Sequence, residues 1–216
     1  MGKVRAFIFD IGGVLFLAKS KRKRASKNLL SSYKELCFLL EGINLPPEEF
    51  WEQSKDIYLQ STKGDISKEK TLNSLSKILS LSPNKVEILF TKAVKKNVIE
   101  NKKLNQLILK LKKRGYKTGI LSIQWPLSKD ILVPSKYYKI FDVLVISYVD
   151  KIRKPDPKSF KLILKKLKVQ PEQAVFIDDK QENLDIAQSL RIKTILFKNN
   201  NQFLRELNKL EKIKLN

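Results

Sequence analysis

The sequence contains no histidine and only one cysteine, Cys37, among its 216 residues. Without imidazole, every mechanism that uses histidine as a base, an acid or a metal ligand is excluded. A single cysteine excludes an internal disulfide and any zinc site built from several thiolates. Catalysis by this chain would therefore depend on carboxylates, lysines, hydroxyl groups and a hard metal ion.

Long apolar runs are also absent, because no stretch approaches the roughly 18 apolar residues of a membrane span. The N-terminal residues are partly apolar, but Asp10 interrupts them, which does not fit a signal peptide. Gly2 is followed at position 6 by Ala6 instead of the serine or threonine of a myristoylation site. We therefore expect a soluble, cytoplasmic protein with no membrane partner.

Negative charge is scarce, with 22 acidic residues against 44 lysines and arginines and a net charge of +22. Clustered cations would favour nucleic-acid binding, but here most are lysines spread along the whole chain. The basic run at residues 19–27, KSKRKRASK, fits a solvated loop or helix start better than a localisation or anion-binding patch. We therefore do not expect nucleic acid as the main partner, although the positive field should attract anionic small molecules such as phosphate esters.

The apolar pattern divides the chain into an α/β part and a helical insertion. Residues 4–10, VRAFIFD, form a short strand-like run that Gly12 and Gly13 end. Residues 28–95 show only helical patterns, separated by prolines. After about residue 98, strand and helix patterns alternate, which predicts a Rossmann-like parallel sheet with helices on both faces. We expect an α/β core over residues 1–17 and 96–216 and a helical subdomain over residues 18–95. The predicted helices are 29–40, 47–59, 67–79, 84–94, 104–111, 157–167, 181–190 and one at the C-terminus, and the later strands are 117–123, 141–147, 174–179 and 193–197.

Polar side chains stand at the ends of several predicted strands, where open parallel sheets bind ligands. Asp10 ends the first strand, Ser122 lies on the second, and Asp178 and Asp179 end AVFIDD. Lys154 follows FDVLVIS within KIRKPDP. One aspartate after a strand is usually a helix cap, but capping does not require acids at two strand ends together with a hydroxyl and a lysine. Converging carboxylates would repel one another, and bound Mg²⁺ would remove that repulsion.

These segments together resemble the motifs of the haloacid dehalogenase superfamily. The motifs are FIFDIGGV, LS with Ser122, KPDP with Lys154, and FIDD followed by Asn183, and they span residues 7–183. The resemblance implies a hydrolase core with an inserted helical cap of the small C1 type. The shape DIGGV, with GDIS in the insertion, is similar to a branch of sugar-phosphate phosphatases with an Asp-x-Gly first motif.

The resemblance also implies roles for these residues. Asp10 would be the nucleophile that forms an aspartyl-phosphate. Ser122 and Lys154 would be catalytic residues that contact the phosphoryl group, and Lys154 would also neutralise charge on Asp10. The remaining implied roles are phosphate binding by Gly12 and Gly13, Mg²⁺ binding by Asp10, Asp178, Asp179 and the backbone carbonyl of Gly12, and support of the acidic loop by Asn183.

Gly12 departs from the family pattern, which has a second aspartate at that position. In such phosphatases this acid protonates the leaving group and then deprotonates the attacking water. Its loss removes catalysis worth about 10²–10⁴-fold, and it matters least for good leaving groups such as an acyl phosphate or an anomeric sugar phosphate. Ile123 is a second departure, because an asparagine often follows the motif-two hydroxyl, and Gln124 is a partial substitute.

Four hypotheses for the function follow. The first is a Mg²⁺-dependent phosphatase of a small phosphorylated metabolite, with impaired acid–base catalysis. The second is a catalytically weak or inactive protein of the same fold that binds a phosphate ligand or regulates. The third is carbon–halogen or phosphonate cleavage, whose branches also lack the second aspartate. The fourth is nucleic-acid binding through surface lysines. The sequence does not identify the substrate or the oligomeric state.

Overall fold

The computed structural model describes residues 3–19, 40, 43 and 45–211. Cys37, the basic run after Lys19 and the helix predicted over 29–40, except Leu40, lie outside the described residues. The described chain divides into two compact units. We call them the α/β unit, within Met1–Leu17, Glu100–Ile123 and Pro134–Asn216, and the helical unit, within Ala18–Ile99 and Gln124–Val133.

The α/β unit contains a five-stranded sheet in which all neighbouring strands are parallel. The strand order is β5-β4-β1-β6-β7, so the chain builds outward from β1 on one side and then crosses to β6 on the other. This order is that of a Rossmann-like sheet and confirms the predicted fold class. The strands are β1 (Ala6–Phe9), β4 (Lys117–Ser122), β5 (Val143–Ile146), β6 (Ala174–Asp178) and β7 (Lys193–Leu196).

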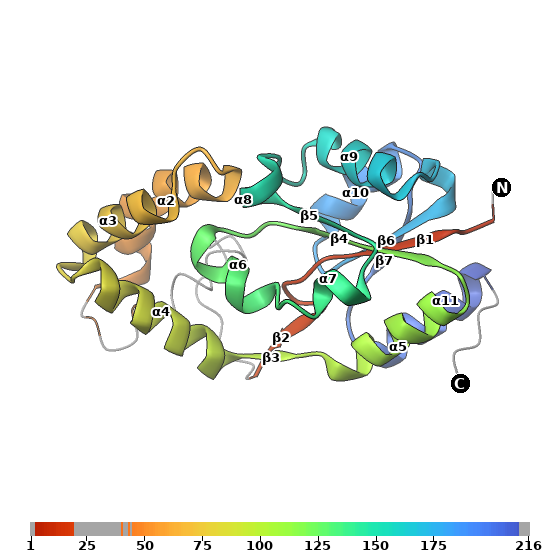
Figure 1. The fold of residues 1–216 in the computed structure, drawn as a ribbon, viewed down its shortest axis with the longest axis horizontal. Coiled ribbons are helices and arrows are strands. Elements are labelled where there is room, and N and C mark those ends of the chain that lie inside the picture. The colour runs from red at the N-terminus through yellow and green to blue at the C-terminus, as the bar shows by residue number, and fades with distance from the viewer. Residues whose placement is uncertain (1–2, 20–39, 41–42, 44, 212–216) are drawn as a thin grey trace. The chain divides into compact units, whose positions relative to one another are not determined.

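Helices cover both faces of this sheet, with α9 and α10 on one face and α5 and α11 on the other (Figure 1). The side chains of the central strand β1 point alternately to the two faces of the sheet, and they are all buried because helices cover both faces. Ala6 and Ile8 pack in a core with side chains of α9 and α10, whereas Phe9 contacts Phe203 of α11. The helices of this unit are α5 (Lys102–Lys113), α7 (Tyr137–Ile140), α8 (Ser147–Asp150), α9 (Pro157–Leu167), α10 (Gln181–Ser189) and α11 (Asn200–Glu211), with a 3₁₀ turn η2 (Pro171–Gln173).

Local sequence signals explain where these helices begin and end. Asp156 accepts a hydrogen bond from the backbone N–H of Lys158 at 2.8 Å, and Pro157 follows it in the first turn of α9. Helix α5 ends at Lys113, and Gly115 then adopts a left-handed φ of 84°. The helices predicted from apolar spacing at residues 104–111 and 157–167 are therefore confirmed.

Within the described residues, the helical unit contains the helices predicted over 47–59, 67–79 and 84–94 and one further helix. Ser67 and Ser82 cap α3 and α4 by accepting backbone hydrogen bonds, and Gly64 ends α2 with a φ of 73°. The further helix, α6, follows Ser122 in the chain, and Trp125 at its start packs against Tyr58 and Phe90. These helices are α2 (Pro47–Lys63), α3 (Lys68–Leu79), α4 (Pro83–Asn97) and α6 (Pro126–Leu132).

Two short strands, β2 (Phe16–Ala18) and β3 (Val98–Glu100), pair in a separate two-stranded sheet. The chain leaves the α/β unit along β2 and returns along β3. Asn101 follows β3, and its side-chain amide donates a hydrogen bond to the carbonyl of Val14 at 3.0 Å. The sequence pattern did not indicate this pair, because three residues are too few to show a strand period.

None of the helices in the described ranges combines the length and the apolar character that crossing a bilayer requires.

Candidate active site

The strand order places two aspartates side by side at one edge of the sheet. Asp10 directly follows β1, and its N–H donates a hydrogen bond to the carbonyl of Ile177 on β6 at 2.9 Å. Asp178 is the last residue of β6. From β1 the chain continues to β4 and β5 on one side of the sheet, and then to β6 and β7 on the other, so the direction of winding changes between β1 and β6. Open α/β sheets bind ligands at the carboxyl ends of the strands at such a point.

Three carboxylates gather there, and we call Asp10, Asp178 and Asp179 the acid cluster. Each offers an oxygen that lies within 4.8 Å of an oxygen from each of the others. Asp10 and Asp178 are buried, and Asp179 is exposed. Carboxylate oxygens are the ligands of hard divalent cations. The acid cluster could therefore hold a metal ion.

Lys154 contacts two members of the acid cluster. Its side chain is only 1% exposed, and Nζ lies 3.0 Å from Oδ1 of Asp10 and 2.6 Å from Oδ2 of Asp178. Nζ also lies 5.2 Å from the ring centroid of Phe176. The lysine is thus held between two acids at the end of two neighbouring strands.

Asp178 is fixed by two further donors. Asn183, in the first turn of α10, donates to Oδ2 at 3.0 Å, and the backbone N–H of Lys180 donates to Oδ1 at 2.9 Å. Asn183 therefore contacts the acidic loop directly, and its supporting role stays a prediction. Lys180 and Phe176 were not predicted to be site residues. Aspartate side chains commonly accept a hydrogen bond from the N–H two residues later in a turn. This pattern could have indicated the contact of Lys180.

The acid cluster carries more negative charge than Lys154 balances. Burial would lower the pKa of Lys154, but attraction to Asp10 and Asp178 outweighs burial and raises it, so the lysine stays charged. Burial raises the pKa of Asp10, against the attraction of Lys154 and with the repulsion of Asp178. Asp179 as a residue is exposed, but its carboxyl group is partly desolvated by surrounding protein atoms. This desolvation, together with repulsion by Asp10 and Asp178, raises the pKa of Asp179 to about 7. A divalent cation would relieve this excess.

The other predicted site residues lie at or just after the carboxyl ends of β4 and β1. Ser122 is the buried last residue of β4, which pairs with β1. Gly12 and Gly13 lie in the turn after β1, where the N–H of Gly13 donates to the carbonyl of Phe16 at 2.8 Å. The carbonyl of Gly12 as a metal ligand, and the phosphate contacts of both glycines, stay predictions.

Residues Gln124–Val133, which begin two positions after Ser122, belong to the helical unit. Gln124, considered as a partial substitute for asparagine, is buried, and its Oε1 accepts a hydrogen bond from Ser128 at 2.7 Å. Trp125 is 1% exposed and packs in an aromatic group with Tyr58 and Phe90. Both side chains therefore contribute to the packing of the helical unit.

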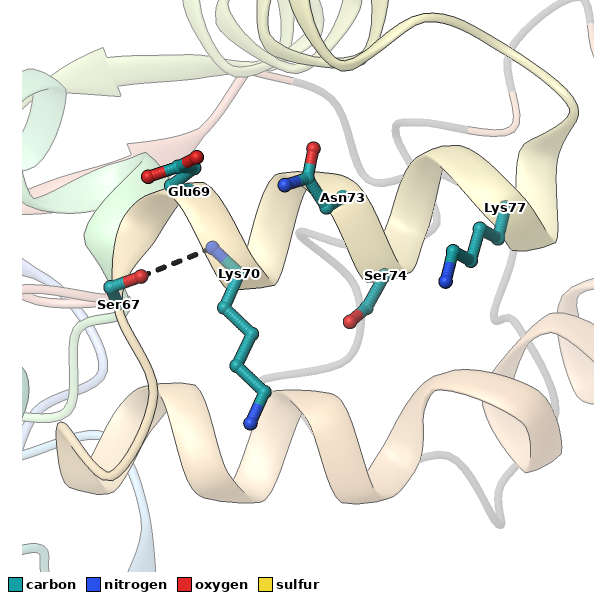
Figure 2. Close-up of a pocket in the computed structure, with 6 residues that line it drawn as sticks. All are labelled: Ser67, Glu69, Lys70, Asn73, Ser74 and Lys77. Carbon is teal, nitrogen blue, oxygen red and sulfur yellow. Dashed lines mark hydrogen bonds between the residues drawn. The ribbon is translucent and has the colours of Figure 1, made fainter.

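A separate pocket runs along α3 in the helical unit (Figure 2). All of its lining residues come from this helix and its cap, and it contains a single carboxylate. It shares no residue with the acid cluster and lacks the ligands of a cation site. The lining residues are Ser67, Glu69, Lys70, Asn73, Ser74 and Lys77.

Solved structures share this fold. A predicted HAD-like family hydrolase from Porphyromonas gingivalis superposes with a TM-score of 0.76 at 21% identity, over 99% of this chain and 100% of that one. A HAD family enzyme from Bacteroides thetaiotaomicron, in complex with magnesium and inorganic phosphate, gives 0.71 at 24% identity over 90% and 94% of the two chains. At these identities the similarity concerns the fold.

Curated relatives match at higher identity but over unequal lengths. Mouse acyl-CoA dehydrogenase family member 10 is 29% identical over 198 residues, which cover 88% of this chain and 18% of that protein. Glyceraldehyde 3-phosphate phosphatase from Pyrococcus furiosus is 33% identical over 93 residues, 42% of this chain and 39% of that protein. The chain spans less than a quarter of the first curated relatives that it matches, at 18%, 24% and 21% of their lengths. The family model of the haloacid dehalogenase-like hydrolases matches residues 4–191 of the sequence, and the chain belongs to this family.

Proposed function

We propose that this hydrolase is a Mg²⁺-dependent phosphatase that acts on a small phosphorylated metabolite through an aspartyl-phosphate on Asp10. The observation that carries the proposal is the acid cluster around the buried amine of Lys154 at the carboxyl ends of β1 and β6. Two similarities support it: the relative from P. furiosus is a phosphatase, and the enzyme from B. thetaiotaomicron binds magnesium and phosphate.

The donor set of the acid cluster fits Mg²⁺. Asp10, Asp178 and Asp179 supply hard oxygen ligands, and the buried lysine in direct contact with them, Lys154, carries one positive charge against three carboxylates. Asp178 is already oriented by Asn183 and Lys180, which is the kind of support that metal ligands have. When bound, Mg²⁺ would polarise the phosphoryl group and offset its charge.

In the first step, a carboxylate oxygen of Asp10 attacks phosphorus. A bond from Asp10 to phosphorus forms while the bond from phosphorus to the leaving oxygen breaks, and the electron pair departs with that oxygen. Lys154 remains charged and contacts Asp10, so it offsets negative charge as the phosphoryl group arrives. Ser122 would donate a hydrogen bond to a phosphoryl oxygen.

In the second step, water attacks the phosphorus of the aspartyl-phosphate, phosphate leaves and Asp10 is restored. Gly12 offers no side chain to protonate the leaving oxygen or to take the proton of water, so both protons must be exchanged with solvent or substrate. The missing catalysis corresponds to about 3–5 kcal/mol of barrier. We therefore propose substrates with good leaving groups, such as acyl or anomeric sugar phosphates, which is consistent with the sugar-phosphatase-like shape of the first motif.

Phosphate release from acetyl phosphate and from a simple alkyl phosphate, with Mg²⁺ and with EDTA, tests the proposal. We expect Mg²⁺-dependent release that is faster for acetyl phosphate and is lost in Asp10→Asn. Asp130→Asn is the matched control, because this aspartate of α6 is exposed and its ion pair within the described chain is a surface contact with the neighbouring Lys129. Equal activity of Asp10→Asn and the unsubstituted protein would refute the mechanism.

Replacing Gly12 tests the part of the proposal that concerns acid–base catalysis. Among described glycines, those with a positive φ are Gly13, Gly64 and Gly115, so the backbone at Gly12 tolerates an aspartate. We expect Gly12→Asp to raise turnover of the alkyl phosphate by about 10²-fold or more, with little effect on acetyl phosphate. An equal change for both substrates would contradict this assignment of the missing group.

The same gap at Gly12 favours a second function, a phosphate-ligand-binding or regulatory protein without turnover. Incubation with acetyl phosphate and Mg²⁺ followed by intact-mass measurement separates the cases. Persistent addition of one phosphoryl group indicates that the first step occurs and that hydrolysis stalls. Binding of phosphate and Mg²⁺ with neither turnover nor a mass change supports the binding protein.

We also propose that the insertion over residues 18–95 serves as the small helical cap that the resemblance implies. Its helices α2, α3 and α4 form a compact unit of their own with α6. A cap of this kind would limit access of water during the first step. Exchange of this segment for that of a related phosphatase should change the substrate preference and leave the Mg²⁺ requirement intact.

A further inference from the structure

Gly13 stands where a side chain has no room. A Cβ added to it would lie 2.5 Å from Cγ of Asp179 and would overlap the carboxylate oxygen Oδ2, whereas real Cβ atoms essentially never approach other atoms to within 3.0 Å. The obstructing atoms belong to a side chain, so the side chain of Asp179 would have to rotate away. The space beside Gly13 is therefore occupied by the carboxylate of Asp179.

Asp179 is also the member of the acid cluster that is held least by hydrogen bonds. Asp10 contacts Lys154, and Asp178 contacts Lys154, Asn183 and the N–H of Lys180. Within the described chain, no hydrogen bond or ion pair to the carboxylate of Asp179 is found. Its place beside two other acids therefore depends on the shape of the surrounding backbone, which includes the turn at Gly13.

We infer that Gly13 is a positioning residue whose missing side chain keeps the carboxylate of Asp179 within the cation-binding cluster. The inference rests on the proposed function, since it takes the acid cluster to be a Mg²⁺ site. It gives Gly13 a role beyond the predicted phosphate contact. Any side chain at this position would turn one of the three carboxylates away from the other two.

Gly115 provides a matched control. Gly13 has a φ of 73° and Gly115 a φ of 84°, so alanine is strained by the backbone at both positions. A Cβ on Gly115, however, would meet no atom within 4 Å. The pair therefore separates the effect of backbone strain from the effect of displacing Asp179.

The experiment measures Mg²⁺ affinity by calorimetry at about pH 8, above the range in which Asp179 is protonated. It compares the unsubstituted chain with Gly13→Ala and Gly115→Ala, and urea unfolding in EDTA gives the stability of each. We expect Gly13→Ala to weaken Mg²⁺ binding by about tenfold or more, as expected when a metal ligand loses its orientation. Gly115→Ala should bind Mg²⁺ like the unsubstituted chain although it loses stability.

A double-variant cycle assigns the loss to Asp179. Asp179→Ala should weaken Mg²⁺ binding by itself, and adding Gly13→Ala to it should weaken binding little further, because the displaced group is already gone. If Gly13→Ala alone is too unstable to purify, the Asp179→Ala background provides the test. There, Gly13→Ala should destabilise the fold less than it does beside Asp179, although the Cβ that remains at position 179 lies 3.1 Å from the added Cβ.

The outcomes distinguish the inference from the function on which it rests. Failure of the unsubstituted chain to bind Mg²⁺ would overturn the cation site and the inference with it. Mg²⁺ binding that is equally strong in Gly13→Ala and Gly115→Ala would overturn the inference alone. Failure of Gly13→Ala to fold even in the Asp179→Ala background would also overturn it, because the requirement for glycine would then lie in the backbone.

Discussion

Two clusters of polar side chains in the α/β unit differ in how well their charges are balanced. In the Glu100 cluster, one carboxylate accepts hydrogen bonds from Asn105 at 2.7 Å, Tyr137 at 3.2 Å and Lys136 at 2.6 Å. In the acid cluster, three carboxylates share one buried lysine. In the first cluster, one negative charge meets one positive charge and two neutral donors. In the second, three negative charges meet one positive charge.

This difference distinguishes a cluster whose charges are balanced from the acid cluster, which we propose to be functional. Burial, aided by nearby Glu100, raises the pKa of Tyr137, so its hydroxyl stays a donor to Glu100. In the acid cluster, the pKa values of Asp10 and Asp179 are raised because the site is desolvated and its acids repel one another. Groups with pKa values perturbed by desolvation and by a specific charged neighbour are concentrated at functional sites. Substitutions in the two clusters should therefore respond differently to Mg²⁺, pH and salt.

The largest effect is expected when Lys154 is replaced. Lys154→Met should destabilise the protein by about 3–5 kcal/mol, because it leaves two buried carboxylates without their partner. Urea unfolding in EDTA measures this loss. Added Mg²⁺ should restore part of it, since a cation bound to the folded state can replace the missing charge.

A loss below about 1 kcal/mol would contradict the interpretation of Lys154 as the partner that balances the acid cluster. Loss of stability without any response to Mg²⁺ would instead indicate that the lysine holds the fold and that the acids do not bind the cation.

The next largest effect concerns the pH dependence of stability in EDTA. Asp179 has a pKa of about 7 when folded and an ordinary value of 3.8. Between these values the folded state binds more protons, so stability should fall as pH rises from about 4 to 7. Because Asp179 is exposed, screening should limit the change to about 2 kcal/mol. Urea unfolding across this range measures it.

Asp179→Asn should flatten this part of the stability profile and should weaken Mg²⁺ binding. Asp185→Asn is the control and should leave both unchanged, because it removes one exposed charge on α10 and keeps an oxygen that can accept from Gln181. A profile that stays steep in Asp179→Asn would assign the pH dependence to another group.

The fold follows from the sequence where a pattern is long enough to repeat. The apolar spacing of α5 and α9 indicated their buried faces, and the strand-like runs at β1, β4 and β6 were short, apolar and ended by polar residues. The pairing of β2 with β3 could not be predicted, because it joins three-residue segments that are far apart in the chain. The packing of α6 with the helical unit depends on contacts of Trp125 that leave no local signal.

The candidate site followed from sheet geometry, because acids at the ends of adjacent parallel strands must lie close together. This places Asp10 beside Asp178, and the contacts of Lys154 and Asn183 join them. The space that Gly13 leaves for Asp179 could not be predicted, because it depends on the path of two turns in three dimensions. The catalytic roles of these residues stay predictions.

A smaller effect is expected in the balanced cluster. Tyr137→Phe removes one of three donors to Glu100 but keeps the ring that packs against Phe16 and Phe141. The loss should be about 1.5 kcal/mol, the value of a hydrogen bond to a charged group. Urea unfolding measures it, and the same change should appear with and without Mg²⁺. A Mg²⁺-dependent loss would show that the two clusters are coupled.

The smallest effect is expected for Lys136→Met, the counterpart of Lys154→Met. The side chain of Lys136 is 50% exposed, so its ion pair with Glu100 should contribute less than about 1 kcal/mol. Raising the salt concentration from about 20 mM to about 0.5 M should remove most of that difference, because salt screens exposed charges. The loss in Lys154→Met should persist at high salt, because its partners are buried. If both losses vanished with salt, the acid cluster would be open to solvent and the contrast between the two clusters would be wrong.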